Sequence, residues 1–253
     1  MHLILLVGFL FLKTGEKFAT QETAGPTVKA LTEYVGGPEM QPQVFNDPGK
    51  AVEYCAANKP ALGIVTPGFY LTYAKALAME PVLETKREGV AVERWVLIAL
   101  KDATDDLAGW QGKTIATPIA AEQRYVLSVV LAGKLGDEVR LKATMDVEGS
   151  VFDLVEEAKG AADAVLMEEA AWKLFEGDGE LGSKLKVIYR SDDLPRDLVV
   201  IFGDADAGKT VKTLKELAGS EEGKKILRSI RVEAFTDVDP DRLARARKLF
   251  NGQ

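Results

Sequence analysis

Apolar residues in this chain follow two different periods. Short apolar runs bounded by glycine, proline or aspartate alternate with stretches whose apolar residues recur at helical spacing. In the first part of the chain the pattern predicts strands at 3–12, 43–46 and 61–65, with helices at 20–35 and 48–57. Asp47 and Pro48 suit the N-cap and the first position of the second helix. This strand-helix alternation predicts a parallel sheet.

The same order returns between residues 113 and 167. It predicts strands at 113–117, 138–144 and 162–167, and helices at 121–133 and 150–159. We interpret two long apolar runs, Trp95–Leu100 and Asp197–Gly203, as the connections between two lobes. The rest of the chain is predicted to be helical at 207–218, 221–231 and 240–250 and to return to the first lobe.

The predicted fold class is therefore α/β, with two Rossmann-like lobes joined by a two-strand hinge. Residues 1–98 and 202–253 are expected to form lobe 1, and residues 99–201 lobe 2. Ligands of open parallel sheets bind outside the carboxyl ends of the strands, so we expect a ligand cleft between the lobes. Two crossings allow the lobes to close on a ligand like a hinge.

Composition narrows the function classes. The 253 residues are 47% hydrophobic and 28% charged, which fits one large or two small globular domains. A net charge of −7 argues against binding to nucleic acid or to an anionic membrane. The chain has one histidine, His2, and one cysteine, Cys55, so an intrachain disulfide is impossible and most nucleophilic hydrolysis is disfavoured. We expect no catalysis, no cofactor and no metal.

The N-terminal run MHLILLVGFLFL resembles the apolar part of a signal peptide. It lacks a cationic segment before it and a small-residue cleavage site after it. It is also too short to cross a bilayer as a helix. We interpret it as a buried strand, and a natural signal peptide replaced by this methionine remains an alternative.

Candidate ligand-binding residues follow from the expected strand ends. They are Thr66 and Tyr70 after strand 61–65, Arg94 before the first connection, Thr117, Gln123 and Arg124 at the turn after strand 113–117, and Glu168 after strand 162–167. Each has an alternative role: a turn threonine, a packed tyrosine, a surface arginine, or a carboxylate that stabilises a helix N-terminus. Trp95 and Trp172 are expected in the core.

Several segments together resemble one family. They include Ala61–Tyr70, Trp95–Asp102, Asp106–Ala116, Gly160–Ala164, Lys186–Ser191 and Leu194–Asp197. In order and spacing they are similar to the type-2 periplasmic solute-binding proteins of ABC transporters, in the phosphate/phosphonate-binding branch. The resemblance implies a protein that captures a small ligand, delivers it to a membrane permease and performs no catalysis. We also expect a monomer. It also implies a periplasmic or membrane-anchored location, and a ligand-contacting acidic residue at Asp197.

The chain departs from that branch at one turn. Phosphonate binders carry a Ser-Thr-Ser-Gly-like turn at a helix N-terminus, where this chain has Thr117–Tyr125. Thr117 keeps one hydroxyl, whereas Glu122 would repel an anion. Phosphonates, organic acids and apolar solutes all remain open as ligands.

A second function class rests on Gly203–Thr210. The segment GDADAGKT fits the phosphate loop of nucleotide hydrolases, in which Lys209 would reach the outer phosphates and Thr210 would bind magnesium. Asp204 and Asp206 would place negative charge in the phosphate cradle, so the alternative is a polar turn before a helix. Nucleotide binding is therefore the competing hypothesis.

Overall fold

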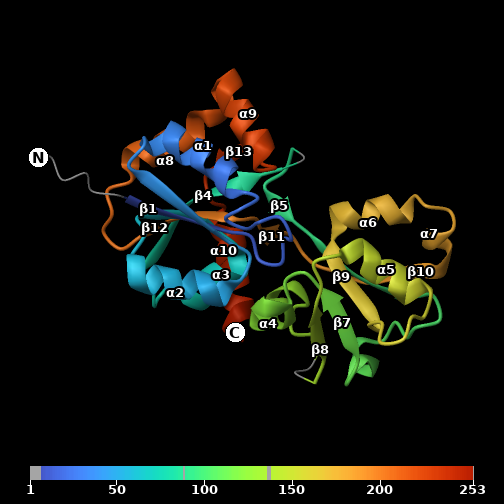
Figure 1. Ribbon diagram of the computed structural model, residues 1–253. Coiled ribbons are helices and arrows are strands. Elements are labelled where there is room, and N and C mark those ends of the chain that lie inside the picture. The colour runs from blue at the N-terminus through green and yellow to red at the C-terminus, as the bar shows by residue number, and fades with distance from the viewer. Residues whose placement is uncertain (1–6, 88, 136–137, 253) are drawn as a thin grey trace, which may run out of the picture. The chain divides into compact units, whose positions relative to one another are not determined.

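The computed structural model describes residues 7–87, 89–135 and 138–252, and its contacts divide the chain into two units (Figure 1). Unit 1 comprises Met1–Val92 and Pro195–Pro240, and unit 2 comprises Glu93–Leu194 and Asp241–Gln253. Residues 3–6 of the first predicted strand, like His2, lie outside the described residues.

Unit 1 contains a mixed six-stranded sheet in the order β13-β4-β12-β3-β1-β2. Its strands are β1 (Val7–Leu12), β2 (Met40–Phe45), β3 (Leu62–Val65), β4 (Met79–Lys86), β12 (Leu198–Phe202) and β13 (Ala234–Thr236). The predicted parallel pairing holds for β1 with β2 and for β1 with β3. β12 instead runs antiparallel to both β3 and β4, so the sheet is not wholly parallel.

Helices cover both faces of this sheet. They are α1 (Gly25–Gly36), α2 (Pro48–Asn58), α3 (Pro67–Tyr73), α8 (Gly208–Glu216) and α9 (Glu221–Ser229). α1, α8 and α9 lie on one face, with α2 and α3 on the other (Figure 1). Asp47 caps α2 as predicted, because its side chain accepts a hydrogen bond from the backbone nitrogen of Lys50 at 2.9 Å.

Unit 2 contains a five-stranded sheet in the order β10-β6-β9-β7-β8. The strands are β6 (Trp95–Leu100), β7 (Thr114–Thr117), β8 (Arg140–Ala143), β9 (Ala164–Glu168) and β10 (Leu185–Arg190). The helices are α4 (Gln123–Tyr125), continued by a π-helical turn over Val126–Val130, then α5 (Val147–Val155), α6 (Glu169–Glu176), α7 (Leu181–Lys184) and α10 (Pro240–Phe250). β7 is parallel to β8 and β9, as the predicted order requires.

The two connections are not the long apolar runs that the sequence suggested. Trp95–Leu100 is β6, which pairs with both β9 and β10 and is buried along most of its length. The second run forms β12 of unit 1. The unit boundaries fall instead at β5 (Val92–Glu93) and β11 (Leu194–Pro195), which pair as a separate two-stranded sheet. Continuous apolar runs are typical of strands buried on both faces, which is why these two belong inside the sheets.

The C-terminal helix also differs from the expected arrangement. Lobe 1 was expected to contain all of 202–253, and α8 and α9 do lie in unit 1. Residues from Asp241 onward, which include almost all of α10, group with unit 2. The buried side of α10 includes Leu243, Ala246 and Phe250.

Gly63 allows β3 to pack tightly in the middle of the unit 1 sheet. A Cβ at this position would lie 2.9 Å from the carbonyl oxygen of Leu10 and 3.2 Å from a ring carbon of Phe202. We expect Gly63→Ala to lower the free energy of unfolding by about 1–3 kcal/mol, measured by urea denaturation. Gly219→Ala is the control, because a Cβ there would meet no atom within 4 Å. Equal stability of the two variants would contradict this account.

Cys55 provides a chemical probe of unit 1. Its side chain is 3% exposed, and burial raises the pKa of the thiol to about 12. Because the thiolate is the reactive form, iodoacetamide at pH 8 should alkylate the native protein far more slowly than the urea-unfolded protein. Comparable rates, followed by mass spectrometry, would show that α2 does not bury this thiol in solution.

Candidate functional site

Polar side chains from three strands meet at one edge of the unit 1 sheet. Lys13 and Thr14 follow β1, and Thr66 follows β3, so both strands end at this edge. β12 runs in the opposite direction, with Leu198 beside Val65, so Asp197 at its start reaches the same place. The Lys13 ammonium donates a hydrogen bond to the Asp197 carboxylate, although the two residues are 184 positions apart.

Two buried hydroxyls lie at this edge. The Oγ1 atoms of Thr14 and Thr66 are 3.4 Å apart. Thr66 also caps α3, since its hydroxyl accepts a hydrogen bond from the backbone nitrogen of Phe69 at 3.4 Å. The turn-threonine role that the sequence left open for Thr66 is therefore present. The structure brings two of the candidates, Thr66 and Asp197, to the same edge.

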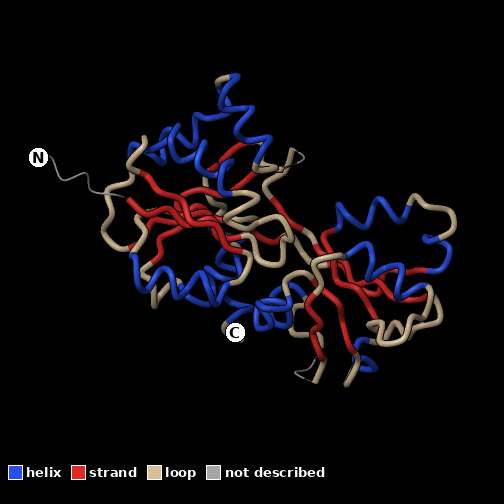
Figure 2. The backbone as a smooth tube through the Cα atoms, viewed as in Figure 1, coloured by secondary structure: helices blue, strands red, loops and turns tan. Residues whose placement is uncertain are grey.

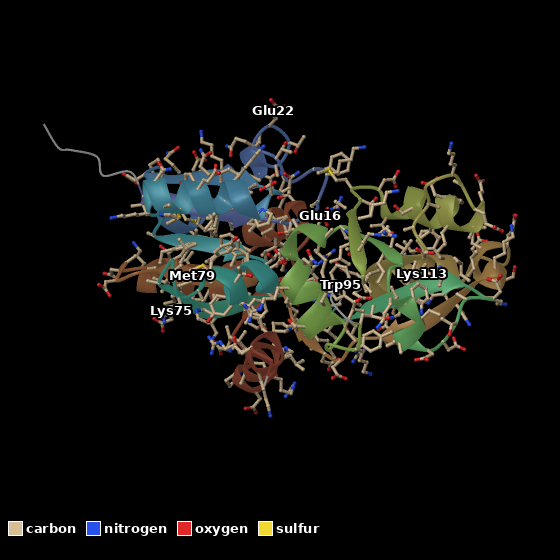
Figure 3. All side chains as sticks on the ribbon, turned by 90° about the horizontal axis from the view of Figure 1, so that it is seen from below. Glu16, Glu22, Lys75, Met79, Trp95 and Lys113 are labelled. Carbon is tan, nitrogen blue, oxygen red and sulfur yellow. The ribbon has the colours of Figure 1, made fainter. Side chains whose placement is uncertain are left out.

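A cavity of about 180 Å³ opens beside Lys13. Phe11, Phe18 and Val28 give it apolar walls, and residues of the long loop between β1 and α1 also line it. Figure 2 draws the loops of the chain in tan. The loop between β1 and α1 also contributes Glu16, labelled in Figure 3. Arg87 and Arg231 supply two further cationic groups, so this cavity combines apolar surface with mainly positive charge.

Tyr70 does not face this cavity. It lies in α3 with 2% of its surface exposed, among the largest fully buried side chains of the protein. The packed-tyrosine alternative therefore describes its position.

Thr117 is the polar side chain at the corresponding edge of unit 2. It ends β7, opposite Ala143 at the end of β8, and is fully buried. Within the described part of the chain, its Oγ1 has no hydrogen-bond partner. Because buried polar atoms are nearly always hydrogen-bonded, an orphan hydroxyl at a strand end is a candidate ligand contact.

The two residues predicted beside Thr117 have different environments. Gln123 begins α4 and is exposed. Arg124 donates a hydrogen bond to the carbonyl oxygen of Phe250 at 2.9 Å, and its guanidinium lies 4.2 Å from the centre of the Phe250 ring. Arg124 thus holds the end of α10.

Arg94 and Glu168 lie next to one another at the start of β6 and the end of β9. Arg94 forms an ion pair with Asp193 at 2.6 Å and a longer one with Glu169 at 3.8 Å. The hydrogen bond and charge of Asp193 raise the pKa of the Arg94 guanidinium. Glu168 is half-buried and occupies the N-cap position of α6. Both positions fit the structural alternatives that the sequence left open for them.

A larger cavity, of about 400 Å³, lies in unit 2 at the amino ends of β7 and β9. Its wall includes Lys113 (Figure 3), whose ammonium is 2.9 Å from the Asp163 carboxylate. Burial acts to raise the pKa of Asp163, but the backbone hydrogen bond from Thr114 and the Lys113 ammonium outweigh it and lower the pKa. Because ligands of parallel sheets bind at the carboxyl ends, this cavity is not the expected ligand site.

The segment Gly203–Thr210 lies at the other edge of unit 1. β12 ends at Phe202 and α8 begins at Gly208, so the expected strand-loop-helix order is present. Since β12 is antiparallel to β3, this loop is at the edge opposite Thr66 and Lys13. Asp204, Asp206 and Lys209 are all exposed. The polar-turn alternative describes this geometry.

Two further properties concern metals and membranes. Among the residues described, no group of three His, Cys, Asp or Glu side chains converges in a way that would hold a metal ion. No described helix combines the length and the apolar character needed to cross a bilayer.

Lys13 is the site residue that the sequence analysis missed. A lysine directly after a strand is usually a solvated loop residue. Only the pairing of β12 with β3 reveals its carboxylate partner, and no local sequence signal indicates that pairing.

Arg124 should be required for the docking of α10. We expect Arg124→Ala to cost about 1–2 kcal/mol of stability, because it loses a hydrogen bond and a cation–π contact. Hydrogen exchange at 241–250 should accelerate in this variant. Arg140→Ala is the control, because the Arg140 guanidinium donates its hydrogen bonds to the carbonyl oxygen of Gly112 and the hydroxyl of Thr114 rather than to α10. Unchanged exchange in α10 of the Arg124 variant would contradict the assignment.

Comparison with known proteins gives the family. Residues 9–243 match the family described as ABC transporter, phosphonate, periplasmic substrate-binding protein. No curated protein sequence matches the chain.

Solved structures of low sequence identity share the fold. PA3383 from Pseudomonas aeruginosa, a binding protein component of an ABC phosphonate transporter, is 17% identical with a TM-score of 0.68, over 96% of this chain and 85% of that one. PhnD1 from Prochlorococcus marinus, in complex with methylphosphonate, is 10% identical with a TM-score of 0.69, over 99% and 98%. XAC2383 from Xanthomonas citri, bound to ATP, is 14% identical with a TM-score of 0.72, over 97% of each chain.

These likenesses establish the two-unit α/β fold of type-2 periplasmic binding proteins, as the sequence predicted. The family match supports solute binding and gives no support to the nucleotide hypothesis. Since that match spans most of the sequence, the chain belongs to the periplasmic substrate-binding proteins of phosphonate ABC transporters.

Proposed function

We propose that this protein captures a small phosphonate-type anion, without changing it chemically, and delivers it to the permease of an ABC transporter. The observation that carries the proposal is the hydroxyl of Thr117 at the carboxyl end of β7, which is buried and has no hydrogen-bond partner among the described residues. The family supplies the ligand class, and this hydroxyl supplies a place for an anionic oxygen to accept a hydrogen bond.

Thr117 suits this role because its hydroxyl would gain a hydrogen bond when the ligand binds. A buried hydroxyl without a partner costs about 1–3 kcal/mol, and a ligand oxygen would recover that cost. The site is thus built for the bound state.

Unit 1 supplies a positively charged group that could bind an anion. Lys13 and Thr66 stand at the carboxyl ends of β1 and β3, where ligands of such sheets bind. We propose that these two residues are the contacts that unit 1 makes with the anion.

The remaining parts of the proposal follow from the family. Membership implies an extracytoplasmic location and a permease partner. We propose that the protein acts as a monomer and is not an enzyme.

Thr117→Val separates binding from stability. The substitution removes a hydroxyl to which no described residue is hydrogen-bonded, so the free protein should be as stable as wild type or more so. Its affinity for methylphosphonate should fall about tenfold, measured by calorimetry. Thr236→Val is the matched control, since its Oγ1 is also buried without a partner among the described residues but lies in β13. Equal affinity of the Thr117 variant and wild type would argue against this contact.

A thermal-shift series tests the function itself. Methylphosphonate at 100 times its Kd should add about 2.7 kcal/mol of stability. Mg-ATP should add none, and Lys209→Ala should change neither result. Stabilisation by Mg-ATP that Lys209→Ala abolishes would overturn the proposal in favour of nucleotide binding.

A further inference from the structure

We propose that the cavity beside Lys13 is an anion subsite that rejects ligands carrying an ammonium group, with Asp197 as the residue that positions Lys13. The inference rests on the proposed function, because it takes the bound anion to be the transported solute. It names the part of the phosphonate class that the site selects: alkylphosphonates without an amine.

The first argument is the order in which a ligand meets the two charges. Lys13 lines the cavity of unit 1, whereas Asp197 is not among the described residues that line it. The Lys13 side chain is 19% exposed and the Asp197 side chain 9%. A ligand in the cavity therefore meets the ammonium, whereas the carboxylate that accepts its hydrogen bond is the less exposed of the two.

The second argument is the number of donors on an ammonium. Lysine has three N–H donors, and one of them is used by Asp197. An anionic ligand oxygen can take another without breaking the pair. A ligand ammonium would have to displace Lys13 from the Asp197 carboxylate. Lys13 has the advantage in this competition, because the chain itself holds it beside that carboxylate.

The third argument is the charge of the cavity wall. Among the described residues that line the cavity, Lys13, Arg87 and Arg231 are cationic and Glu16 is the one with a carboxylate. The first turn of α1 also borders the cavity and contains no acidic residue. The cationic groups of this wall would repel a ligand ammonium and attract an anion.

The walls also limit the rest of the ligand. Phe11 and Val28 are buried and apolar, and Phe18 lies at the rim with 60% of its surface exposed. A cavity of about 180 Å³ with such walls suits a short alkyl group. Charge and shape together point to a small alkylphosphonate.

The test uses two ligands that differ by one ammonium group, ethylphosphonate and 2-aminoethylphosphonate. Calorimetry on the wild-type protein should give at least about tenfold tighter binding of ethylphosphonate. Lys13→Met should weaken ethylphosphonate and remove or reverse this preference, because the Asp197 carboxylate is then available to the ligand ammonium. Lys75→Met, an exposed lysine after α3, is the control and should keep the wild-type ratio.

Asp197→Asn tests the positioning role. This variant should weaken both ligands and keep the preference, since the cationic wall remains. Removing one partner of a buried ion pair is costly, so Lys13→Met could fail to fold. The double variant Lys13→Met/Asp197→Leu then replaces it, and it should show a clearly smaller preference than wild type, because only Arg87 and Arg231 of the cationic wall remain.

The outcomes separate the two proposals. If wild-type protein binds neither phosphonate, the proposed function fails. If wild type binds both ligands equally, or if Lys13→Met and the double variant keep the wild-type ratio, the function stands and the inference about Lys13 is overturned.

Discussion

The ion pair between Lys13 and Asp197 depends on the insertion of β12 between β3 and β4, and the architecture of unit 1 depends on the same insertion. β12 places Leu198 beside Val65 on one side and Glu84 on the other. Between β4 and β12 the chain builds unit 2, so β12 is the strand with which it returns to unit 1. The two unit boundaries, at β5 and β11, therefore lie between these two neighbouring strands in the sequence.

The ion pair itself is a poor source of stability. Removing two charges from water costs several kcal/mol for each, and apolar replacements of buried pairs are often neutral or stabilising. What the pair provides is a fixed position for an ammonium at the carboxyl edge of the sheet, where a solvated lysine would otherwise sample many rotamers. The Thr14 and Thr66 hydroxyls also have fixed positions at this edge, because the register between β1 and β3 places them side by side.

Local signals in the sequence predicted local structure well. The Asp47–Pro48 start of α2 and the parallel order of β1, β2 and β3 followed from capping chemistry and alternation. Trp95–Leu100 was misassigned because an apolar run has the same composition in a connection and in a buried strand. β4 was missed because Pro81 interrupts its pattern, and the register with β12 shifts beside that proline. The partners of Lys13 and Arg124 are both more than 100 residues away, beyond any local pattern.

Each unit has a polar group with unused hydrogen-bonding capacity at the carboxyl edge of its sheet. Among the described residues, the Lys13 ammonium of unit 1 donates to Asp197 alone, and the buried Thr117 hydroxyl of unit 2 has no hydrogen-bond partner. An anionic oxygen that accepts a hydrogen bond from either group stabilises the conformation that presents that group over one that does not. A binding protein needs this dependence, because a ligand can shift a conformational equilibrium only by the difference in its affinity for the two states.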